Sequence, residues 1–467
     1  MSTDDGLLSP VSVGHDDDVA DAAVLRALVD TELALVRAWA RVGALDDATA
    51  HAIHDALRDA GGPGTIDAAA ARAGGNPVIP LVAVLRERVP EPARTWVHRG
   101  ATSQDVLDSA LMLTAGRAGA RIVSSLHDAE AALTRLAVAE RDTVAAARTL
   151  TQHAVPTTVG ARAAGWVRGI RRARLRLERQ LAELPAQLGG AAGTLAAFAE
   201  TLRTDPGSSP SPRSLSERRR DEARAARPDA PADVARSAAG LVVAFASELG
   251  LATPEAPWHT GRWPVTELGD VLTQAVDALG VFAADVATLA RTEIAELSTG
   301  APGGSSAMPQ KQNPTDAVLI RSAAIRAPHL AATLHSAAAL AVDERPDGAW
   351  HAEWPVLREL LRLALGAAAH ADALAAGLRV DRSAVARNLA LTGAAIVSER
   401  LRIVLVPLIG ADRFAHLLAS GDGTLDDRVR SLPEAARLDL DDLLDPARYT
   451  GLAAESVDAL ATQEDPA

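Results

Sequence analysis

Residues 303–314 read GGSSAMPQKQNP and form the most informative segment of this chain. A Gly/Pro-rich run precedes the segment, and a helical pattern resumes after its closing Asn-Pro, so we expect a loop that leads into a helix. Two serines, an amine and a side-chain amide lie close together on this loop, at Ser305, Ser306, Lys311 and Asn313. Because nearly all other basic residues are arginines, a lysine at this position is not a background feature of the composition.

Local chemistry leaves two interpretations of this loop open. In the structural one, Asn313 is a helix N-cap, Pro314 is the first helical residue, and the glycines only allow the chain to turn. In the functional one, the loop is a lid that supplies a serine oxygen as a base, while Lys311 and Asn313 hold a substrate carboxylate or a developing oxyanion. Local chemistry alone gives the two interpretations about equal weight.

Residues 304–314, GSSAMPQKQNP, resemble the signature GSSxMPxKxNP of the aspartase/fumarase superfamily. That superfamily includes fumarase, aspartase, argininosuccinate lyase, adenylosuccinate lyase and 3-carboxy-cis,cis-muconate cycloisomerase. The signature is long and specific. Ser305 aligns with the catalytic base of the superfamily. Since a serine is a poor base by itself, the N–H groups of the closed loop and Lys311 are expected to stabilise its alkoxide.

Composition limits the classes of protein to which the chain can belong. Hydrophobic residues make up 48% of the 467 residues, enough for a large core, and few aromatics among many alanines favour helices. The net charge of −13 argues against a nucleic-acid partner. The chain has no cysteine, which excludes disulfides, thiolate metal sites and a cysteine nucleophile. It shows neither an apolar signal core nor an apolar run of membrane-span length, so we expect a soluble, cytoplasmic protein without a membrane partner.

Apolar residues recur at helical spacing along most of the chain. Residues 1–20 look frayed, and residues 74–82, GGNPVIPLV, are rich in turn residues and predict a loop. A short helix carries His51 and His54, and without a third ligand nearby a solvated face is a better interpretation than a metal site. The predicted helices are one that begins at Ala22, long helices over about 122–200 with few breaks, helices over 241–251, 265–297 and 313–341, and shorter helices over 375–467.

Residues 98–105, HRGATSQD, precede a helical run and also have two interpretations. In the structural one, Thr102 and Asp105 have the spacing of a capping box. In the functional one, the helix N-terminus offers unpaired N–H groups and a positive dipole end to a carboxylate, with hydroxyls from Thr102 and Ser103 and a proton or charge from His98. The stretch resembles the first conserved region of the superfamily, HxGxTSxD, which implies that His98, Thr102 and Ser103 bind the substrate.

Residues 148–158, RTLTQHAVPTT, resemble the second conserved region, RTHxQxAxPxT. The resemblance implies that Gln152 and Thr158 bind the substrate. Leu150 departs from the pattern, because fumarases and the amino-acid lyases have a histidine of their acid–base apparatus there, whereas a cycloisomerase has a bulky apolar residue. His153, one helical turn away in the predicted helix, is the candidate catalytic imidazole.

Four further stretches are similar to the cycloisomerase branch of the superfamily. Residues 204–232, rich in Pro, Ser, Arg and Asp, interrupt this similarity and predict a disordered or loosely helical insertion. The four stretches are residues 189–196 (GGAAGTLA), 258–262 (WHTGR), 344–355 (ERPDGAWHAEWP) and 445–461 (DPARYTGLAAESVDALA).

The resemblance spans nearly the whole chain and implies an all-α, elongated subunit of three domains. These are an N-terminal helical domain at 1–108, a central bundle of long helices at 109–355 and a small helical domain at 356–467. Points far apart along parallel helices of one chain do not easily converge, and the conserved regions lie on different long helices. In the superfamily a tetrameric helix bundle builds each site from three subunits, so the resemblance implies a homotetramer with shared sites.

In the chemistry of the superfamily, a base removes a proton beside a carboxylate and a β-leaving group departs, or the reverse addition occurs. The charge moves onto the carboxylate and gives an aci-carboxylate, which preorganised donors must stabilise. Lys311, Asn313 and loop amides are the expected donors, and Ser305 is the expected base. The resemblance implies a small di- or tricarboxylate-like substrate and neither a metal nor an organic cofactor.

Similarity over the full length favours a 3-carboxy-cis,cis-muconate cycloisomerase-like reaction, in which a substrate carboxylate oxygen adds to a double bond. Gln310, Gln312 and Asp343 depart from residues usual in that branch. Arg321 is a further departure, which either grips a second anionic group such as a nitro or carboxylate group, or forms a surface ion pair.

The alternative reaction is that of a fumarate-releasing lyase, such as one that eliminates nitrite from nitrosuccinate. Argininosuccinate and adenylosuccinate lyases are less favoured, because Leu150 replaces their histidine. A crystallin-like structural protein without activity is a non-enzyme alternative. The presence of both Ser305 and Lys311 argues against it.

Overall fold

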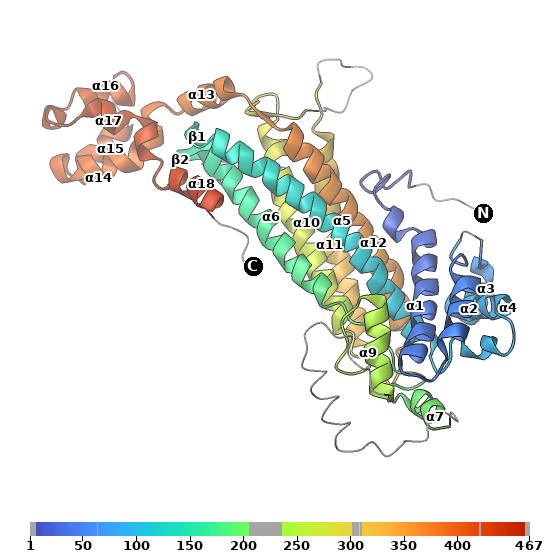
Figure 1. Ribbon diagram of the computed structural model, residues 1–467. Helices are drawn as coiled ribbons and strands as arrows, with labels where there is room; N and C mark the ends of the chain where they lie inside the picture. The colour runs from blue at the N-terminus through green and yellow to red at the C-terminus, as the bar shows by residue number, and fades with distance from the viewer. Residues whose placement is uncertain are drawn as a thin grey trace, which may run out of the picture. The chain divides into compact units, whose positions relative to one another are not determined.

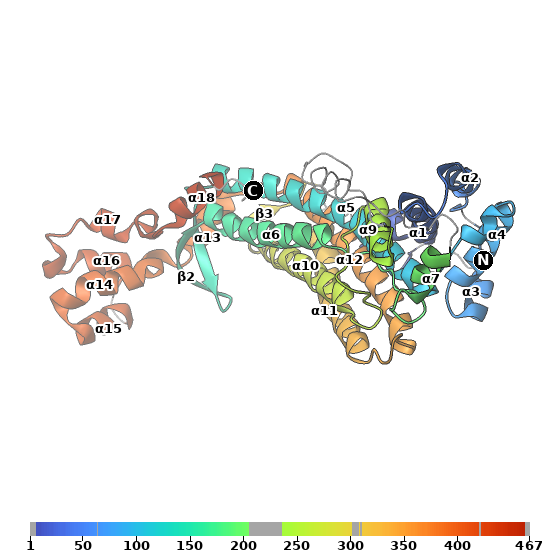
Figure 2. The same ribbon diagram turned by 60° about the horizontal axis from the view of Figure 1, so that its bottom comes forward.

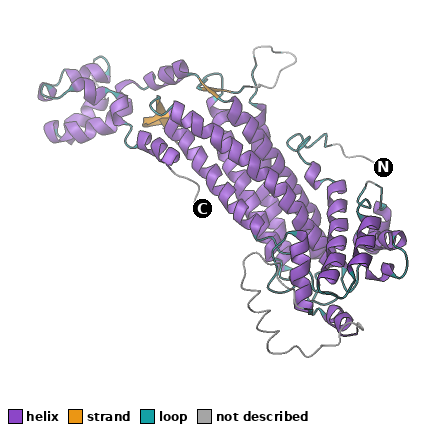
Figure 3. Ribbon diagram, viewed as in Figure 1, coloured by secondary structure: helices purple, strands orange, loops and turns teal. Residues whose placement is uncertain are grey.

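The computed structural model describes residues 6–62, 64–204, 236–300, 308, 311–419 and 422–462. Helices form most of this structure and the strands are few and short (Figure 3), which confirms the predominantly helical fold. The candidate base Ser305 lies outside the described residues. So does the predicted insertion at 204–232, except for Thr204.

The chain divides into two compact units, which are described separately. The first unit comprises Met1–Ile122, Arg176–Thr273 and Arg326–Leu365, and the rest of the chain forms the second unit. The predicted division into three domains stays a prediction. Five long helices contribute residues to both units (Figure 1): α5 (Ser103–Ala139), α6 (Val159–Ala182), α10 (Trp263–Leu289), α11 (Thr315–Ala339) and α12 (Gly348–Gly377).

Small residues allow the long helices to approach one another closely. In the second unit, a Cβ added to Gly280 of α10 would lie 2.8 Å from the Cβ of Ala324 in α11. In the first unit, a Cβ added to Gly269 of α10 would lie 2.7 Å from Leu334 Cδ1 of α11. Contacts this short leave no room for a side chain at either glycine, which explains why these helices are rich in small residues.

The first unit contains the N-terminal helices. Helix α1 (Asp21–Arg41) packs against α9 (Ala238–Leu249). Trp39 of α1 is fully buried, and its ring centroid lies 5.7 Å from that of Trp96 and 5.8 Å from that of Phe198. The other elements of this unit are η1 (Asp17–Val19), α2 (Asp47–Leu57), α3 (Ala68–Gly74), α4 (Val78–Arg88), η2 (Ala93–Trp96) and α7 (Ala196–Thr204).

The second unit contains two short sheets and the C-terminal helices. Strand β1 (Val144–Thr149) pairs antiparallel with β2 (Gln152–Thr158), which is labelled in Figure 2. Strand β3 (Leu297–Ser298) pairs antiparallel with β4 (Arg379–Val380). Most of the C-terminal elements contribute to one apolar core, which also includes Ala146 of β1. In chain order, the C-terminal elements are α13 (Arg382–Ala390), η4 (Gly393–Val397), α14 (Ser398–Ile409), α15 (Ala411–Ala419), α16 (Leu425–Arg430), η5 (Pro433–Ala435), α17 (Leu440–Leu444), η6 (Pro446–Tyr449) and α18 (Ala453–Thr462).

The hairpin of β1 and β2 corrects the prediction of nearly continuous helix over 122–200. Pro156 has no N–H to donate within a helix, and the β-branched Val155, Thr157 and Thr158 around it favour a strand. His153 is therefore not one helical turn from Leu150. It lies on β2, beyond a two-residue turn.

Other element boundaries also differ from the prediction. Helix α4 begins at Val78 inside the predicted loop at 74–82, because Asn76 Oδ1 caps it by accepting from the amides of Val78 and Ile79 at 3.0 and 3.3 Å. Helix α10 ends at Leu289 rather than at residue 297, and Ala295 beyond it adopts a φ of 53°, which a helix does not accommodate.

The start of α11 lies one residue later than the structural interpretation of the signature segment expects. The first helical residue is Thr315 and not Pro314. The carbonyl of Pro314 accepts from Val318 N at 3.1 Å, so Pro314 has the N-cap position expected for Asn313. The predicted helices that begin near Ala22 and carry His51 and His54 are confirmed as α1 and α2.

Within the described ranges, α10 is the only helix that by itself is long and apolar enough to cross a membrane, with a mean hydropathy of 1.3 over 18 residues. Core helices pass the same test, and 44% of that window is buried within the chain. Leu272, Val276 and Phe282 lie on its buried side. The expectation of a protein without a membrane span stays a prediction.

Replacing Gly160 by alanine is expected to destabilise the second unit. The new methyl group would lie 2.6 Å from Ala137 O, 2.7 Å from Arg141 Cα and 2.8 Å from Glu140 O, all backbone atoms that cannot rotate away. We expect a loss of about 1–3 kcal/mol, measured as a lower midpoint of urea unfolding. Gly165→Ala on the same helix is the control, because no atom lies within 4 Å of its added methyl group. Equal midpoints for both variants would contradict this view of the packing.

Candidate active site

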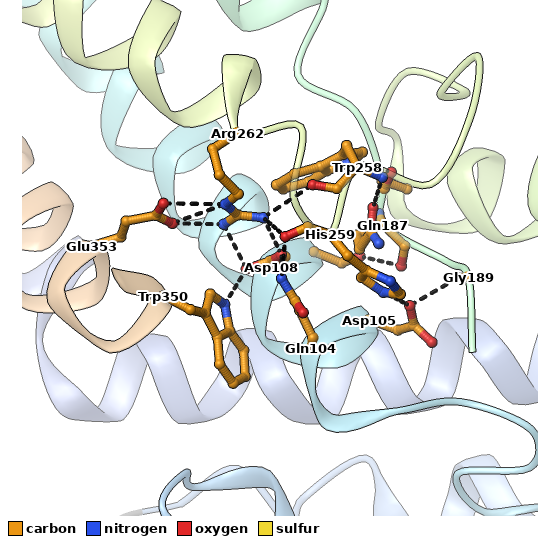
Figure 4. A network of polar contacts seen from close by, with 12 residues as sticks. Gln104, Asp105, Asp108, Gln187, Gly189, Trp258, His259, Arg262, Trp350 and Glu353 are labelled. Carbon is orange, nitrogen blue, oxygen red and sulfur yellow. Dashed lines mark hydrogen bonds and ion pairs between the residues drawn. The ribbon is translucent and has the colours of Figure 1, made fainter. Parts of the chain in front are cut away.

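A buried carboxylate, Asp105, joins three segments of the first unit at the start of α5 (Figure 4). Its Oδ1 accepts from Gly189 N at 2.8 Å and lies 2.9 Å from His259 Nε2. Its Oδ2 accepts from Gly190 N at 2.9 Å and from Thr102 N at 3.0 Å. Because four donors converge on one side chain, Asp105 fixes the N-terminus of α5 relative to the two stretches that carry these donors.

A second buried cluster lies one turn further along α5, around Arg262 (Figure 4). Arg262 donates from Nη1 to Asp108 Oδ2 and from Nη2 to Glu353 Oε2, both at 2.7 Å. Trp350 Nε1 donates to Asp108 Oδ1 at 2.9 Å. Burial lowers the pKa of Arg262, but the two carboxylates outweigh this effect and raise that pKa. Burial also raises the pKa of Glu353 more than Arg262 lowers it. The guanidinium has no exposed surface, so this cluster supports the site from within.

His98 lies beside the buried carboxylate of Glu32 in α1, with Nδ1 2.6 Å from Oε1. Burial lowers the pKa of His98, but the charge of Glu32 and this hydrogen bond outweigh burial and raise that pKa. The backbone of His98 has a φ of 60°, a strained value for a non-glycine residue that the surrounding packing must hold in place. The raised pKa keeps a positive charge near the N-terminus of α5 to higher pH than for an ordinary histidine.

Thr102 and Ser103 lie at the N-terminus of α5, which begins at Ser103. The amide of Thr102 donates to Asp105, which confirms one half of the predicted capping box. Within the described ranges the hydroxyl groups of Thr102 and Ser103 have no hydrogen-bond partner. No described residue therefore competes for these hydroxyls at this helix end, where the dipole favours negative charge.

The tip of the β1–β2 hairpin is strained and exposed. Leu150 and Thr151 have φ values of 49° and 71°, the left-handed region that costs a non-glycine residue about 1–2 kcal/mol. The side chain of Leu150 is 96% exposed, and Gln152 beside it is exposed as well. The turn therefore combines backbone strain with an apolar side chain exposed to solvent.

His153 and Thr158 lie further along β2. His153 is half-buried, with Nδ1 2.7 Å from Thr392 Oγ1. Thr158 is buried, and its Oγ1 accepts from Ala161 N at 3.0 Å, which caps the start of α6. Thr158 thus has a structural role in the second unit, and its predicted contact with substrate stays a prediction.

The structure describes Met308 and residues 311–314 of the signature segment. Lys311, the only lysine of the chain, is exposed, and its amide donates to Met308 O at 3.0 Å. Asn313 is half-buried, and its carbonyl accepts from Thr315 N at 2.9 Å. Arg321 is exposed on α11, and no ion pair joins it to any residue that the structure describes.

The predicted site residues fall into two groups. His98, Thr102 and Ser103 belong to the first unit, and the other predicted site residues that the structure describes belong to the second. Sequence reasoning missed Glu32, the partner of His98, although a lone acidic residue on the apolar side of α1 was a signal for a buried polar contact. It also missed the convergence on Asp105, whose partners His259 and Gly189 lie 154 and 84 residues away in the chain.

Within the described ranges, no group of three or more His, Cys, Asp or Glu side chains is arranged to hold a metal ion. His51 is exposed on α2, with Nδ1 2.6 Å from the carbonyl oxygen of Asp47. This placement agrees with a solvated helix face. The expectation of a site without metal or organic cofactor stays a prediction.

Comparisons with known proteins agree on the family of this chain. A family model described as a lyase matches residues 16–205 and 234–328. The chain is 45% identical to nitrosuccinate lyase of Streptomyces davaonensis, over 97% of this chain and 94% of that protein. It is 37% identical to 3-carboxy-cis,cis-muconate cycloisomerase of Pseudomonas aeruginosa, over 93% of this chain and 90% of that protein. The crystal structure of 3-carboxy-cis,cis-muconate lactonizing enzyme from Pseudomonas putida matches with a TM-score of 0.80 and 31% identity, over 97% of this chain and 98% of that one.

These matches define the class of the protein. The chain belongs to the lyase family, within the aspartase/fumarase superfamily that the signature segment predicted. It is an enzyme, a lyase or cycloisomerase of that superfamily. The crystallin-like alternative is therefore set aside.

The contact between His98 and Glu32 is expected to make the stability of the protein depend on pH. Because the folded-state pKa of His98 is raised, the pair stabilises the fold fully below the ordinary value of about 6.5 and loses this contribution as pH rises through the folded-state pKa. The difference in unfolding free energy between wild type and His98→Gln should therefore shrink as pH rises above about 6.5. In a Glu32→Gln background the trend should disappear. A trend that persists there would assign it to another group.

Proposed function

We propose that this enzyme eliminates nitrite from nitrosuccinate and releases fumarate. The observation that carries the proposal is the 45% identity to the nitrosuccinate lyase of Streptomyces davaonensis, over 97% of this chain. The identity to the cycloisomerase of Pseudomonas aeruginosa is lower, at 37%. The expectation from the sequence alone was cycloisomerisation, with nitrite elimination as the alternative. We favour nitrite elimination instead.

The reaction requires proton removal and loss of an anion, without oxidant or reductant. A base takes a proton from the methylene carbon of nitrosuccinate, and the charge moves onto the adjacent carboxylate as an aci-carboxylate. Those electrons then form the carbon–carbon double bond. The carbon–nitrogen bond breaks, and its electron pair leaves with nitrite. The products are fumarate, nitrite and the protonated base.

The signature segment supplies the proposed base and the donors that stabilise the aci-carboxylate. Ser305 takes the proton, a role supported by its alignment with the base of the superfamily. Lys311 is exposed and is the only lysine of the chain, so its ammonium is a distinct charge that can approach an anionic intermediate. Asn313 adds an amide donor at the start of α11.

The N-terminus of α5 is the proposed binding site for a substrate carboxylate. The hydroxyls of Thr102 and Ser103 have no partner among the described residues, and the helix dipole adds favourable potential. The raised pKa of His98 keeps a positive charge nearby. Asp105 engages backbone amides and His259, so its negative charge is already compensated and does not repel the substrate.

The hairpin supplies the remaining contacts that we propose. Gln152 is exposed beside the tip and offers an amide to the substrate. His153 is the proposed imidazole of the acid–base apparatus, with Thr392 fixing its Nδ1 side at 2.7 Å. Leu150 at the tip gives this part of the site an apolar wall where other superfamily branches place a histidine.

Arg321 is the proposed partner of the nitro group. It lies on the exposed side of α11, six residues beyond Thr315, and forms no ion pair with any described residue. A guanidinium presents two parallel N–H groups, which match the two oxygens of a nitro group or of departing nitrite.

The site is proposed to be shared between subunits of a homotetramer. On the surface of the second unit, α10 and α11 expose Val281, Val318 and Ile325, with Val281 62% and Ile325 70% exposed. Val281 and Ile325 flank the close contact of Gly280 with Ala324, so they border one seam between the two helices. Apolar residues gathered along such a seam favour burial against further copies of the same helices. Each site would then take the α5 N-terminus, the hairpin and the signature segment from three subunits.

Cycloisomerisation of 3-carboxy-cis,cis-muconate remains the second candidate reaction. The observation in its favour is the similarity to the lactonizing enzyme from Pseudomonas putida, with a TM-score of 0.80. In this reaction a carboxylate oxygen of the substrate adds to a double bond, and the neighbouring carbon takes a proton. The same aci-carboxylate stabilisation serves both reactions, so the group that Arg321 meets would decide between them.

An ultraviolet assay run beside nitrite detection distinguishes the two reactions. With nitrosuccinate, the purified enzyme should release fumarate and nitrite in equal amounts, and it should leave the diene absorbance of 3-carboxy-cis,cis-muconate unchanged. Loss of that absorbance without nitrite release would reverse the proposal in favour of cycloisomerisation.

Arg321→Ala in the same assay should raise KM for nitrosuccinate about tenfold or more, because a charge-assisted contact to the substrate is lost. An unchanged KM would make Arg321 a surface residue.

Mixing variants tests whether the site is shared. Ser305→Ala and Thr102→Val should each be nearly inactive, but subunits exchanged between them should regain activity. If one site takes Thr102 and Ser305 from different subunits, about one quarter of the sites in random mixtures contain both intact residues. Ser305→Ala mixed with Lys311→Ala is the control, because both residues come from one segment and no site would be restored. No recovery in the first mixture, with subunit exchange verified by mass spectrometry, would exclude the shared site.

A further inference from the structure

A buried ion cluster around Glu296 lies in the second unit, outside the groups assigned so far. Glu296 is 1% exposed. Its Oε1 accepts from Arg148 Nη2 at 2.5 Å and from Asn388 Nδ2 at 2.9 Å. Its Oε2 accepts from Arg148 Nη1 at 3.1 Å and lies 3.5 Å from Arg162 Nη1. One carboxylate therefore compensates two guanidinium groups and satisfies an amide.

The four side chains of this cluster come from four different segments. Arg148 is on β1 of the hairpin, Arg162 is on α6, Asn388 is on α13, and Glu296 directly precedes β3. Arg162 Nη2 also donates to the carbonyl of Ala146 on β1 at 3.1 Å, so the hairpin is held from two sides. The cluster thus connects the strand that pairs with β2 to the strand that leads toward the signature segment.

The backbone around Glu296 is also fixed. Its carbonyl accepts from Asp381 N at 3.0 Å, directly beside the β3–β4 pair. Four residues further on, Gly300 packs on Gly377 so closely that a Cβ on Gly300 would lie 2.9 Å from Gly377 Cα. The backbone from Glu296 to Gly300 is therefore held at both ends by contacts within the second unit.

The charges of the cluster depend on one another. Burial raises the pKa of Glu296, but the hydrogen bonds from Arg148 and Asn388 and the charges of the two arginines outweigh burial and lower that pKa. Removing the negative charge would leave Arg148 and Arg162 close together and uncompensated. An unpaired buried charge is far more costly than a missing pair, so the loss of Glu296 should loosen the segments that the cluster connects.

We propose that Glu296 is a positioning residue for the reaction: it holds the hairpin that carries Gln152 and His153 in register with the strand that enters the signature segment. The inference rests on the proposed function, because it takes both segments to belong to the active sites. Glu296 touches no reacting atom. It acts through Arg148 and through β3, and a displacement of about 1 Å in either segment is enough to lower turnover strongly.

The test compares Glu296→Gln with Glu130→Gln in the full-length enzyme. Glu130 is a matched control, because it is also buried in the second unit and also pairs with two arginines, Arg171 and Arg174, but it connects α5 to α6 instead. Glu296→Gln should lower kcat about 10- to 100-fold while KM changes less than about threefold. Glu296→Asp, which keeps the charge, should recover part of kcat. Glu130→Gln should retain near-normal kcat at a comparable loss of thermal stability.

Hydrogen–deuterium exchange supplies a measurement that is independent of substrate. Peptides covering 144–158 and 294–300 should exchange faster in Glu296→Gln than in wild type, and not in Glu130→Gln. Equal loss of kcat in both variants, or unchanged exchange in these peptides, would overturn the positioning role. If wild type turns over neither nitrosuccinate nor 3-carboxy-cis,cis-muconate, the proposed function fails. The exchange result would then decide separately whether Glu296 connects the two segments.

Discussion

The buried carboxylate of Asp105 is the constraint on which the N-terminal part of the site depends. Three backbone amides and the His259 imidazole converge on its two oxygens, all within 3.0 Å. With its charge compensated in this way, Asp105 can lie at a helix N-terminus without opposing an incoming carboxylate. Thr102 and Ser103 lie on this fixed helix end, so binding at the proposed carboxylate site would require little reordering of the chain.

The second unit uses the same physical device at Glu296. A carboxylate in a low-dielectric interior interacts strongly with its donors, and it is expensive to leave any of them unpaired. Such a cluster admits few alternative arrangements, so it specifies where β1 and β3 lie. Arginine suits this role better than lysine, because its planar fork bonds both carboxylate oxygens while remaining charged. The arginine-rich composition is consistent with this use, and the single lysine stands in the signature segment.

The proposed shared site would explain both the strained turn and the exposed apolar residues. Leu150 is displayed on a left-handed turn, and Val281 and Ile325 lie exposed along the α10–α11 seam. An isolated chain gains nothing from these features, whereas an assembly that covers them would bury the apolar surface and hold the strained turn in place. The proposed tetramer therefore links the alanine-rich helices, which pack through small residues, to the chemistry at their ends.

The sequence by itself determined the helical class, the superfamily and the residues of three conserved regions, because each depends on local composition and on motifs whose members lie within about a dozen residues. The capping contact of Thr102 with Asp105 was predictable for the same reason. Pro156 and its β-branched neighbours are a local signal for the second strand, but the hairpin at 144–158 also depends on strand pairing and on packing of β1 against α13, which comes more than 220 residues later. Only the tertiary structure showed that Asp105 meets His259, 154 residues away, and that Glu296 meets Arg148, 148 residues away. Contacts between residues so distant in the chain are decided by how the helices and strands pack, and no local pattern records them.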